Sequence, residues 1–255
     1  MKSHAFDRGV VYCYNNLFKY KTEQTKDYLL VHQIKRDTVF LLNPDYDYTK
    51  ISQRNNVLVY CESAIADAKI INETCYNLEE LFSNPDKQTR RGTVFFNRDG
   101  VLLSETELTV GDRLNVYTAW KDYKYTKVFR IAFNPERYLR SYRLNEVKDL
   151  NIYERIIYVE KQPYAVINFS LDGDVAFEIS FVSKFFDKQL RFINDLNECI
   201  LIGCFYDLYK QFGIKIINVG PDAGIKGLKE FKNKINCFYN PIWSITLRNN
   251  QPTLL

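Results

Sequence analysis

Three lysines near the C-terminal end of the chain are spaced so that they could bind phosphate groups. Lys226, Lys229 and Lys232 follow one another at three-residue intervals in a segment that reads as a short helix. Residues three apart are neighbours on a helix surface, so these lysines could follow a phosphate backbone together. The loop before them carries Asp222 as a helix cap, and a helix N-terminus can receive an anion. The alternative interpretation is an ordinary solvated lysine face.

A second basic segment, Lys121–Arg143, contains seven basic and two acidic residues, a local net charge of +5 in a chain whose total is +4. Aromatic residues alternate with these charges, which is typical of surfaces that neutralise phosphates and stack bases. We therefore expect a nucleic-acid partner, DNA or tRNA. Besides the three lysines, the expected contacts are Tyr123, Lys124, Tyr125, Lys127 and Arg130. The alternative is a pair of strands with one solvated basic face.

The positions of the cysteines and histidines limit which metal sites and nucleophilic catalytic sites the chain could form. The six cysteines form no CxxC pair, and both histidines, His4 and His32, lie in the first 32 residues. No metal site and no Ser-His-Asp or Cys-His constellation is therefore expected. Unpaired cysteines favour a reducing compartment. The sequence has no apolar leader and no apolar stretch long enough to cross a bilayer, so we expect a cytoplasmic protein.

Composition predicts a globular protein of mixed α/β class. The 255 residues are 46% hydrophobic and 15% aromatic, enough for a sizeable core and rich in strand-forming side chains. We divide the chain into a β-rich N-terminal segment (1–55), the first, degenerate half of a larger domain (56–150), and the second half of that domain (151–255).

Turn signals and hydrophobic periods predict the elements of the first 150 residues. Strands are expected at 9–14, 27–34, 38–43 and 56–61. Short helices are expected at 62–73 and at 77–84, the second with Asn77 as its cap and Pro85 as its stop. A hairpin is expected at 92–108, turning at Asp99 and Gly100, and a helix followed by a strand at 112–133.

The last hundred residues have clearer periods. Three strands precede a long helix over 190–212, which is capped by Gly213. A strand ending near Gly220, a helix over 224–235 and a final strand complete the order β-β-β-α-β-α-β. We predict that 151–247 forms one mixed sheet flanked by those two helices.

This order, and the segment 209–235 with its Phe231–Lys232 pair, resembles the GCN5-related N-acetyltransferase (GNAT) fold. The resemblance is nearest to the FemAB-like and phosphatidylglycerol lysyltransferase-like aminoacyl transferases, with the phage Mom-like DNA-modifying transferases also near. It implies an α/β (α+β) protein with a mixed central sheet flanked by helices and a β-rich N-terminal part. It further implies an acyl- or aminoacyl-transferase that acts on or beside a nucleic acid, with phage DNA modification as one form. The alternative is a non-catalytic nucleic-acid- or protein-binding member of the fold.

One departure from the family bears on the cofactor. Members that use acetyl-CoA carry a glycine-bearing loop before the long helix, whose backbone N–H groups hold the pyrophosphate. The corresponding segment here, 181–192, contains no glycine and includes Phe185 and Phe186. We therefore expect acetyl-CoA to bind poorly. An activated acyl donor is expected, such as an aminoacyl-tRNA or an acyl-CoA, and no metal.

Acyl transfer to an amine needs a base, a donor that stabilises the oxyanion, and a place that holds both reactants. In this fold a splayed gap between parallel strands supplies that place, beside 177–181 and 216–218. Glu178 is the only carboxylate in the middle of the first strand and is the candidate base, although it could instead face solvent. Asn218 could position a carbonyl or amine, or could close the turn that follows. Transferases of this kind often protonate the leaving group with a tyrosine, so Tyr206, Tyr209 and Tyr239 are candidate general acids, and spacing singles out none of them.

Overall fold

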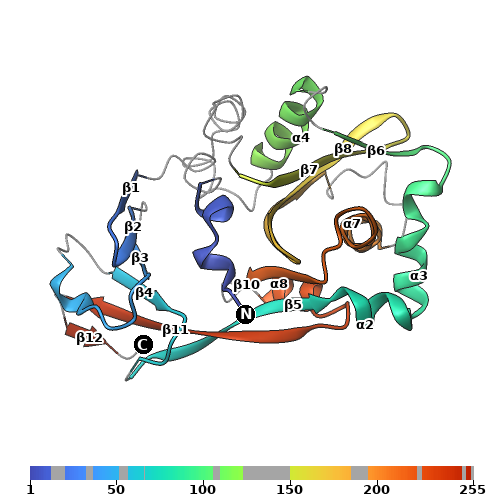
Figure 1. Ribbon diagram of the computed structural model, residues 1–255. Helices are drawn as coiled ribbons and strands as arrows, with labels where there is room; N and C mark the ends of the chain where they lie inside the picture. Colours follow the sequence, from blue (N-terminus) through green and yellow to red (C-terminus); the bar gives the residue numbers. More distant parts are fainter. Residues whose placement is uncertain are drawn as a thin grey trace.

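The computed structural model describes most of the chain, and its strands join into one continuous sheet (Figure 1). The described residues are 1–12, 21–32, 37–51, 57–65, 67–105, 110–122, 150–184, 195–222, 226–248 and 251–253. The strands, in chain order, are β1 (Lys21–Gln24), β2 (Tyr28–His32), β3 (Asp37–Leu41), β4 (Val57–Cys61), β5 (Lys69–Asn77), β6 (Val101–Glu105), β7 (Ile152–Val159), β8 (Gln162–Asp172), β9 (Val175–Ser183), β10 (Ile216–Pro221), β11 (Phe238–Arg248) and β12 (Gln251–Thr253). Across the sheet they run β1-β2-β3-β4-β11-β5-β10-β9-β8-β7-β6, and β12 pairs with β11.

The order predicted for the C-terminal part is confirmed. β7, β8 and β9 form an antiparallel meander, α7 (Leu196–Phe212) follows, and β10 pairs in parallel with β9 before α8 (Lys226–Lys232) leads to β11. α7 ends at Gly213, whose φ of 68° is left-handed and whose N–H donates to the carbonyl of Leu208. Both helices are described over shorter spans than predicted, and 185–194 lies outside the described residues.

Several elements of the first 150 residues are also confirmed. β2 and β4 fall within predicted strands, and β3 overlaps the strand predicted at 38–43. α2 (Leu78–Ser83) begins after Asn77, whose side chain accepts from the N–H of Glu80 at 3.2 Å. α4 (Val110–Asp122) is the helix expected from residue 112. The strand expected after it lies outside the described residues.

Three other predictions for this part are wrong. The segment 62–73, predicted helical, runs into β5, which is hydrogen-bonded on both sides by β10 and β11. The segment 92–108, predicted as a hairpin, instead supplies the end of α3 (Lys87–Thr93), a 3-10 turn and the single strand β6. Residues 9–12, predicted as part of a strand, are helical. In each segment, packing against distant parts of the chain outweighs local propensity.

Helices cover both faces of the sheet, and Figure 1 shows α4 and α7 on opposite sides of the curved strand β8. α7 packs with α2 and α3 over one buried cluster that includes Tyr76 and Phe205, whereas α4 packs over another that includes Phe177. A buried ion pair between Arg113 of α4 and Glu154 of β7 fixes α4 to the sheet. In the described part of the chain, no helix is both long and apolar enough to cross a membrane.

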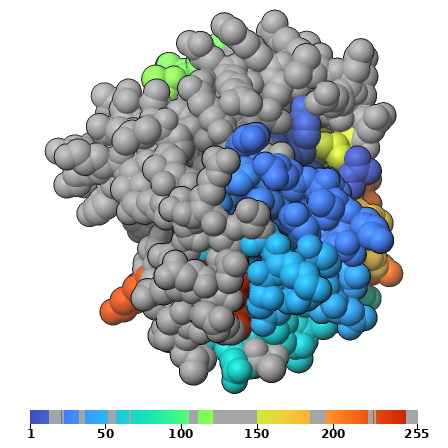
Figure 2. Space-filling model, turned by 90° about the vertical axis from the view of Figure 1, so that its left-hand side faces the viewer, coloured from blue at the N-terminus to red at the C-terminus, as the bar shows by residue number. Residues whose placement is uncertain are grey.

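The N-terminal strands have a core of their own. Val39, Val59 and Leu247 are buried in it, so β3 and β4 pack together with the far end of β11. Side chains of β1 to β4 form a continuous surface in the space-filling view (Figure 2). β11 pairs with both β4 and β5 and thereby joins this part to the rest of the sheet.

The contact between α3 and α7 depends on a glycine. A Cβ added at Gly92 would lie 2.4 Å from both Cβ and Cγ2 of Ile202, too close for either helix to remain in place. We expect Gly92→Ala to lower the free energy of unfolding by about 1–3 kcal/mol, the cost of overpacking a core. Gly111→Ala is the control, because nothing lies within 4 Å of its added methyl in α4. Urea denaturation measures both, and equal stabilities of the two variants would contradict the prediction.

Candidate functional site

β9 and β10 stop pairing part-way along their length. They are hydrogen-bonded in parallel register only over Ile216–Asn218 with Val175–Phe177. Beyond this point β9 stays with β8 up to Ser183, while β10 shifts its register with β5 in a bulge after Asn218. The place beyond Phe177 and Asn218 is called the β9–β10 fork below. It lies where the sequence predicted a splayed gap.

Glu178 is the first residue of β9 inside the fork. Its neighbours Phe177 and Ile179 belong to the cluster under α4, so the Glu178 side chain points to the other face of the sheet, toward α8. Desolvation raises the pKa of Glu178 to about 7, and the nearby charge of Lys232 only partly opposes this rise. A carboxyl group that titrates near neutral pH can exchange protons with a substrate under physiological conditions.

Lys232 is placed differently from the other two lysines of α8. Its ammonium group is buried and donates to three carbonyls of β10: those of Val219 at 2.5 Å, Gly220 at 2.9 Å and Pro221 at 3.0 Å. Burial lowers the pKa of Lys232, while Glu178 acts in the opposite direction. Its contacts hold the end of β10 in the shape of the fork.

The prediction that Lys226, Lys229 and Lys232 share one phosphate-binding face is therefore wrong for Lys232. Six residues along a helix turn the side chain by about 600°, so Lys232 lies about 120° around α8 from Lys226 and faces the sheet. Lys226 and Lys229 are exposed, and Lys226 lies 3.8 Å from Glu230. These two remain candidates for contact with an anion.

Asn218 lies on the face of the sheet opposite the Glu178 side chain. Its amide donates to Glu73 at 2.8 Å and accepts from the N–H of Gly220 at 2.9 Å. Glu73 is fully buried on β5 and also accepts from the amide of Asn240 at 3.1 Å. The two candidate residues thus do not converge on one pocket, and Asn218 instead fixes the bulge of β10.

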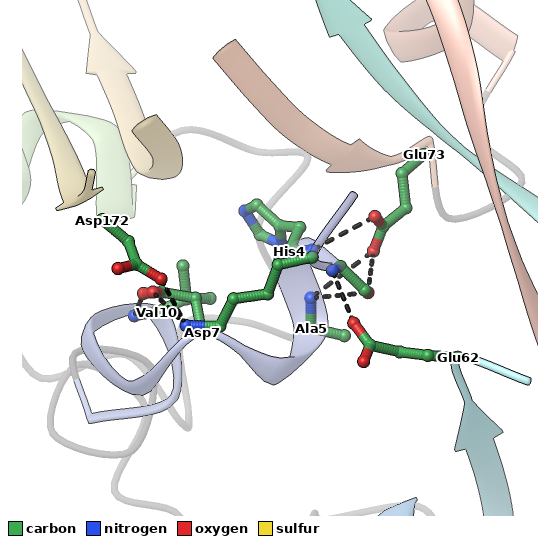
Figure 3. A network of polar contacts seen from close by, with 9 residues as sticks. His4, Ala5, Asp7, Val10, Glu62, Glu73 and Asp172 are labelled. Carbon is green, nitrogen blue, oxygen red and sulfur yellow. Dashed lines mark hydrogen bonds and ion pairs between the residues drawn. The ribbon is translucent and has the colours of Figure 1, made fainter. Parts of the chain in front are cut away.

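The N-terminal residues lie beside Glu73 (Figure 3). Because Asn218 also donates to Glu73, they approach the fork from the Asn218 face. The His4 ring donates from Nε2 to the backbone carbonyl of Glu178, which can only accept. Burial holds the pKa of His4 below its usual range, so the ring is neutral despite the nearby Glu73. Ser3 donates from its hydroxyl to Glu73 at 2.6 Å, and the His4 backbone N–H donates to the other oxygen at 3.1 Å.

His4 and Glu73 are the site residues that sequence reasoning missed. His4 lies in the first few residues, far in sequence from every other candidate, and Glu73 lies in a segment predicted as a helix. The available signal for Glu73 was one carboxylate in the otherwise strand-like run 70–76, and His4 has no comparable signal.

Of the remaining predicted site residues, Tyr239 is described by the structure, and it lies away from the fork. Tyr239 lies on β11, which β5 separates from β10, and its hydroxyl donates to Asn233 at 3.1 Å. It is 45% exposed. The predicted nucleic-acid contacts in the basic segment lie outside the described residues; they are Tyr123, Lys124, Tyr125, Lys127 and Arg130.

Gly220 is where His4 and β10 come closest. Its φ is 67°, which costs alanine about 1–2 kcal/mol, and an added Cβ would lie 2.8 Å from Nδ1 of His4. We expect Gly220→Ala to lower the free energy of unfolding more than Gly213→Ala, which has φ 68° but nothing within 4 Å. Adding His4→Ala to Gly220→Ala should remove most of that difference. Chemical denaturation of the wild type, the two glycine variants and the double variant checks this prediction. Equal effects of the two glycine substitutions would contradict it.

Comparison with known proteins identifies the fold through solved structures. No protein-family model and no curated protein matches the chain. The C-terminal domain of a protein assigned as a lysylphosphatidylglycerol synthetase from Agrobacterium fabrum aligns with a TM-score of 0.62 at 13% identity, covering 92% of this chain and 86% of that one. L-PGS from Bacillus licheniformis aligns with a TM-score of 0.60 at 14% identity, covering 94% and 87%.

A tandem GNAT protein from the clavulanic acid biosynthesis pathway is also similar, with a TM-score of 0.51 at 10% identity over 89% of this chain and 79% of that one. Likenesses at such identities concern the fold. The chain therefore has a GNAT-like fold, a mixed sheet flanked by helices, similar to that of the Agrobacterium fabrum and Bacillus licheniformis structures.

Proposed function

We propose that this chain, with its GNAT-like fold, is an acyl- or aminoacyl-transferase whose reaction takes place at the β9–β10 fork. One observation carries the proposal: Glu178 lies inside the fork with its pKa raised to about 7. Perturbed carboxyl groups in such positions are typical of catalytic bases. The similarity in fold to transferases supports the reaction class.

The reaction is the transfer of an acyl group to an amine. The amine nitrogen forms a bond to the acyl carbon, and ionised Glu178 takes the proton that the nitrogen loses. The bond from that carbon to the donor's oxygen or sulfur breaks, and the leaving atom takes up a proton, so that Glu178 is again ionised once its own proton has passed to that atom or to water. Lys232 holds the fork in shape and places a positive charge near Glu178. Its three N–H groups already donate to three carbonyls, so we assign the oxyanion to other donors.

We further propose that the donor is carried by a polyanion such as an aminoacyl-tRNA. The absence of glycine from 181–192 argues against a pyrophosphate cradle of the acetyl-CoA kind. The exposed lysines Lys226 and Lys229 support a phosphate-bearing carrier. DNA modification of the phage type is a narrower form of the same proposal.

Transfer assays with two labelled donors test this proposal. With L-lysinamide as the amine, we expect transfer from lysyl-tRNA and none from acetyl-CoA, and calorimetry should detect no micromolar binding of acetyl-CoA. The double variant K226M/K229M should flatten the dependence of log affinity for tRNA on log salt by about 0.7–0.9 for each phosphate that the lysines no longer neutralise. Tight acetyl-CoA binding would contradict the donor, and an unchanged salt slope would contradict the role of the two lysines.

A non-catalytic binding protein of the same fold is the second candidate. It is favoured by the His4 side chain, which occupies the fork and bonds to the carbonyl of Glu178. Such a protein would bind tRNA or DNA without transferring an acyl group from any donor. The same assays separate the two, because only a transferase forms acylated L-lysinamide.

A further inference from the structure

Residues 1–7, called the N-terminal strap below, close the β9–β10 fork. Beyond the parallel pairing of β9 with β10, the ring of His4 donates to the carbonyl of Glu178. The absence of a side chain at Gly220 lets the same ring lie against β10, since an added Cβ would be 2.8 Å from Nδ1. A side chain from the start of the chain thus fills the place between two strands that come more than 170 residues later.

The strap is held mostly by polar bonds (Figure 3). Ser3 donates from its backbone N–H to Glu62 at 2.6 Å and from its hydroxyl to Glu73 at 2.6 Å. Lys2 donates to Asp172 at 2.7 Å, on the exposed surface. Within the described residues, the buried apolar clusters include no member of the strap. A ligand that offers equivalent donors could therefore replace these polar bonds. Withdrawal would also break ring contacts of His4 with Phe177 and of Phe6 with Phe40.

Glu73 would be the group most affected by loss of the strap. Both of its oxygens accept bonds from the strap, one from the Ser3 hydroxyl and the other from the His4 N–H. With the strap withdrawn, only the amides of Asn218 and Asn240 would remain of these donors. A buried carboxylate with unmet acceptor capacity is costly, and a charged ammonium group is the donor that satisfies it best.

We propose that the N-terminal strap is a displaceable occupant of the fork, and that its withdrawal opens a binding position for a primary amine on Glu73. The amine is the amino group of an aminoacyl donor, because an ammonium ion on Glu73 cannot attack an acyl carbon and the Glu178 side chain points to the other face of the sheet. That assignment rests on the proposed transferase function. Displacement of the strap by an amine does not depend on catalysis. It can be measured on the whole chain in the absence of any acyl donor.

Hydrogen exchange followed by mass spectrometry tests the displacement. L-lysinamide is the amine probe, and its analogue with both amines acetylated is the control. We expect L-lysinamide to raise the exchange rate of amides in 1–7 by about 5-fold or more, because ligand binding shifts the population toward the open strap. The acetylated analogue should leave it unchanged. The same exchange measurement with lysyl-tRNA and with uncharged tRNA then tests the source of the amine. Faster exchange in 1–7 with lysyl-tRNA alone identifies the amino group of an aminoacyl donor.

Two variants test the same idea through affinity. S3A/H4A removes side chains that hold the strap, so its affinity for L-lysinamide should rise by about 10-fold as the cost of opening falls. H32A is the matched control, since His32 lies on β2 with Glu23 and Asp37 as its partners. The second variant, K2C/D172C, is closed by a short bis-maleimide and should lose L-lysinamide binding. Wild-type protein treated with the same reagent controls for native cysteines.

The proposal is overturned if S3A/H4A binds the amine no better than H32A while the cross-linked protein binds it as well as wild type. It is also overturned if saturating L-lysinamide leaves exchange in 1–7 unchanged. Acyl transfer has no part in these readouts. If the amine displaces the strap but no acyl transfer occurs, the strap proposal is supported and the transferase proposal is contradicted. If acyl transfer occurs while the strap stays in place, the transferase proposal is supported and the strap proposal is contradicted.

Discussion

Glu178→Gln is expected to lower the kcat of acyl transfer by about 10²–10⁴-fold, the usual contribution of a general base. In the wild-type protein the rate should rise with pH through about 7, because Glu178 accepts a proton only when ionised and its pKa is raised to about 7. A pH–rate profile with lysyl-tRNA and L-lysinamide measures both effects. Glu230→Gln is the control, an exposed carboxylate on α8. A Glu178→Gln enzyme with wild-type kcat would remove Glu178 from the mechanism.

Glu178→Gln should lower activity but raise the stability of the folded protein at neutral and higher pH. The pKa of Glu178 is higher in the folded protein than its ordinary value of 4.5, so its favourable contribution is complete below pH 4.5 and is lost as the pH rises through about 7. Above pH 7, Glu178→Gln should therefore raise the free energy of unfolding, by up to about 3 kcal/mol. Urea denaturation at pH 5 and pH 8 checks the sign. A variant less stable than wild type at pH 8 would contradict the assigned pKa.

Lys232→Met is expected to have the largest effect on stability. It leaves three carbonyls of β10 without their donor and removes the positive charge near Glu178, so the free energy of unfolding should fall by about 3 kcal/mol. Lys229→Met on the exposed side of α8 should change it by less than about 0.5 kcal/mol. Chemical denaturation of both variants provides the comparison.

Lys232→Met should also move the pH dependence of activity. The Lys232 charge lowers the pKa of Glu178 against the effect of desolvation, so its removal should shift the midpoint of the pH–rate profile above 7. Lys229→Met should leave the midpoint in place. A midpoint that falls in Lys232→Met would show that Glu178 is not the group that titrates.

The sequence predicts best those elements whose periodicity agrees with their final packing. α7 has apolar residues at helical spacing and a glycine cap, and β8 has a continuous apolar run, so local pattern identifies both. β5 differs because its first residues follow an alanine-rich stretch that reads as a helix. Its strand conformation comes from β10 and β11, which lie more than 130 residues further along the chain.

Some residues of the candidate site could likewise be predicted from local sequence, and others could not. Glu178 could be found because it is a lone carboxylate within a predicted strand beside the expected gap. His4 and Glu73 could not, because their roles arise from contacts across 174 and 145 residues, with Glu178 and Asn218 respectively. Lys232 was identified from its match to a family position, but helical spacing alone could not show that its ammonium group faces inward.

The position of β5 between β10 and β11 has a consequence for synthesis of the chain. β5 leaves the ribosome early, yet both strands that border it lie more than 130 residues further along the chain. Until those strands emerge, both edges of β5 stay open to pairing with other chains, and a sheet closed by such distant contacts forms slowly. The nascent protein should therefore depend on chaperones until β10 and β11 have emerged, and the fork, built around β10, should form only then.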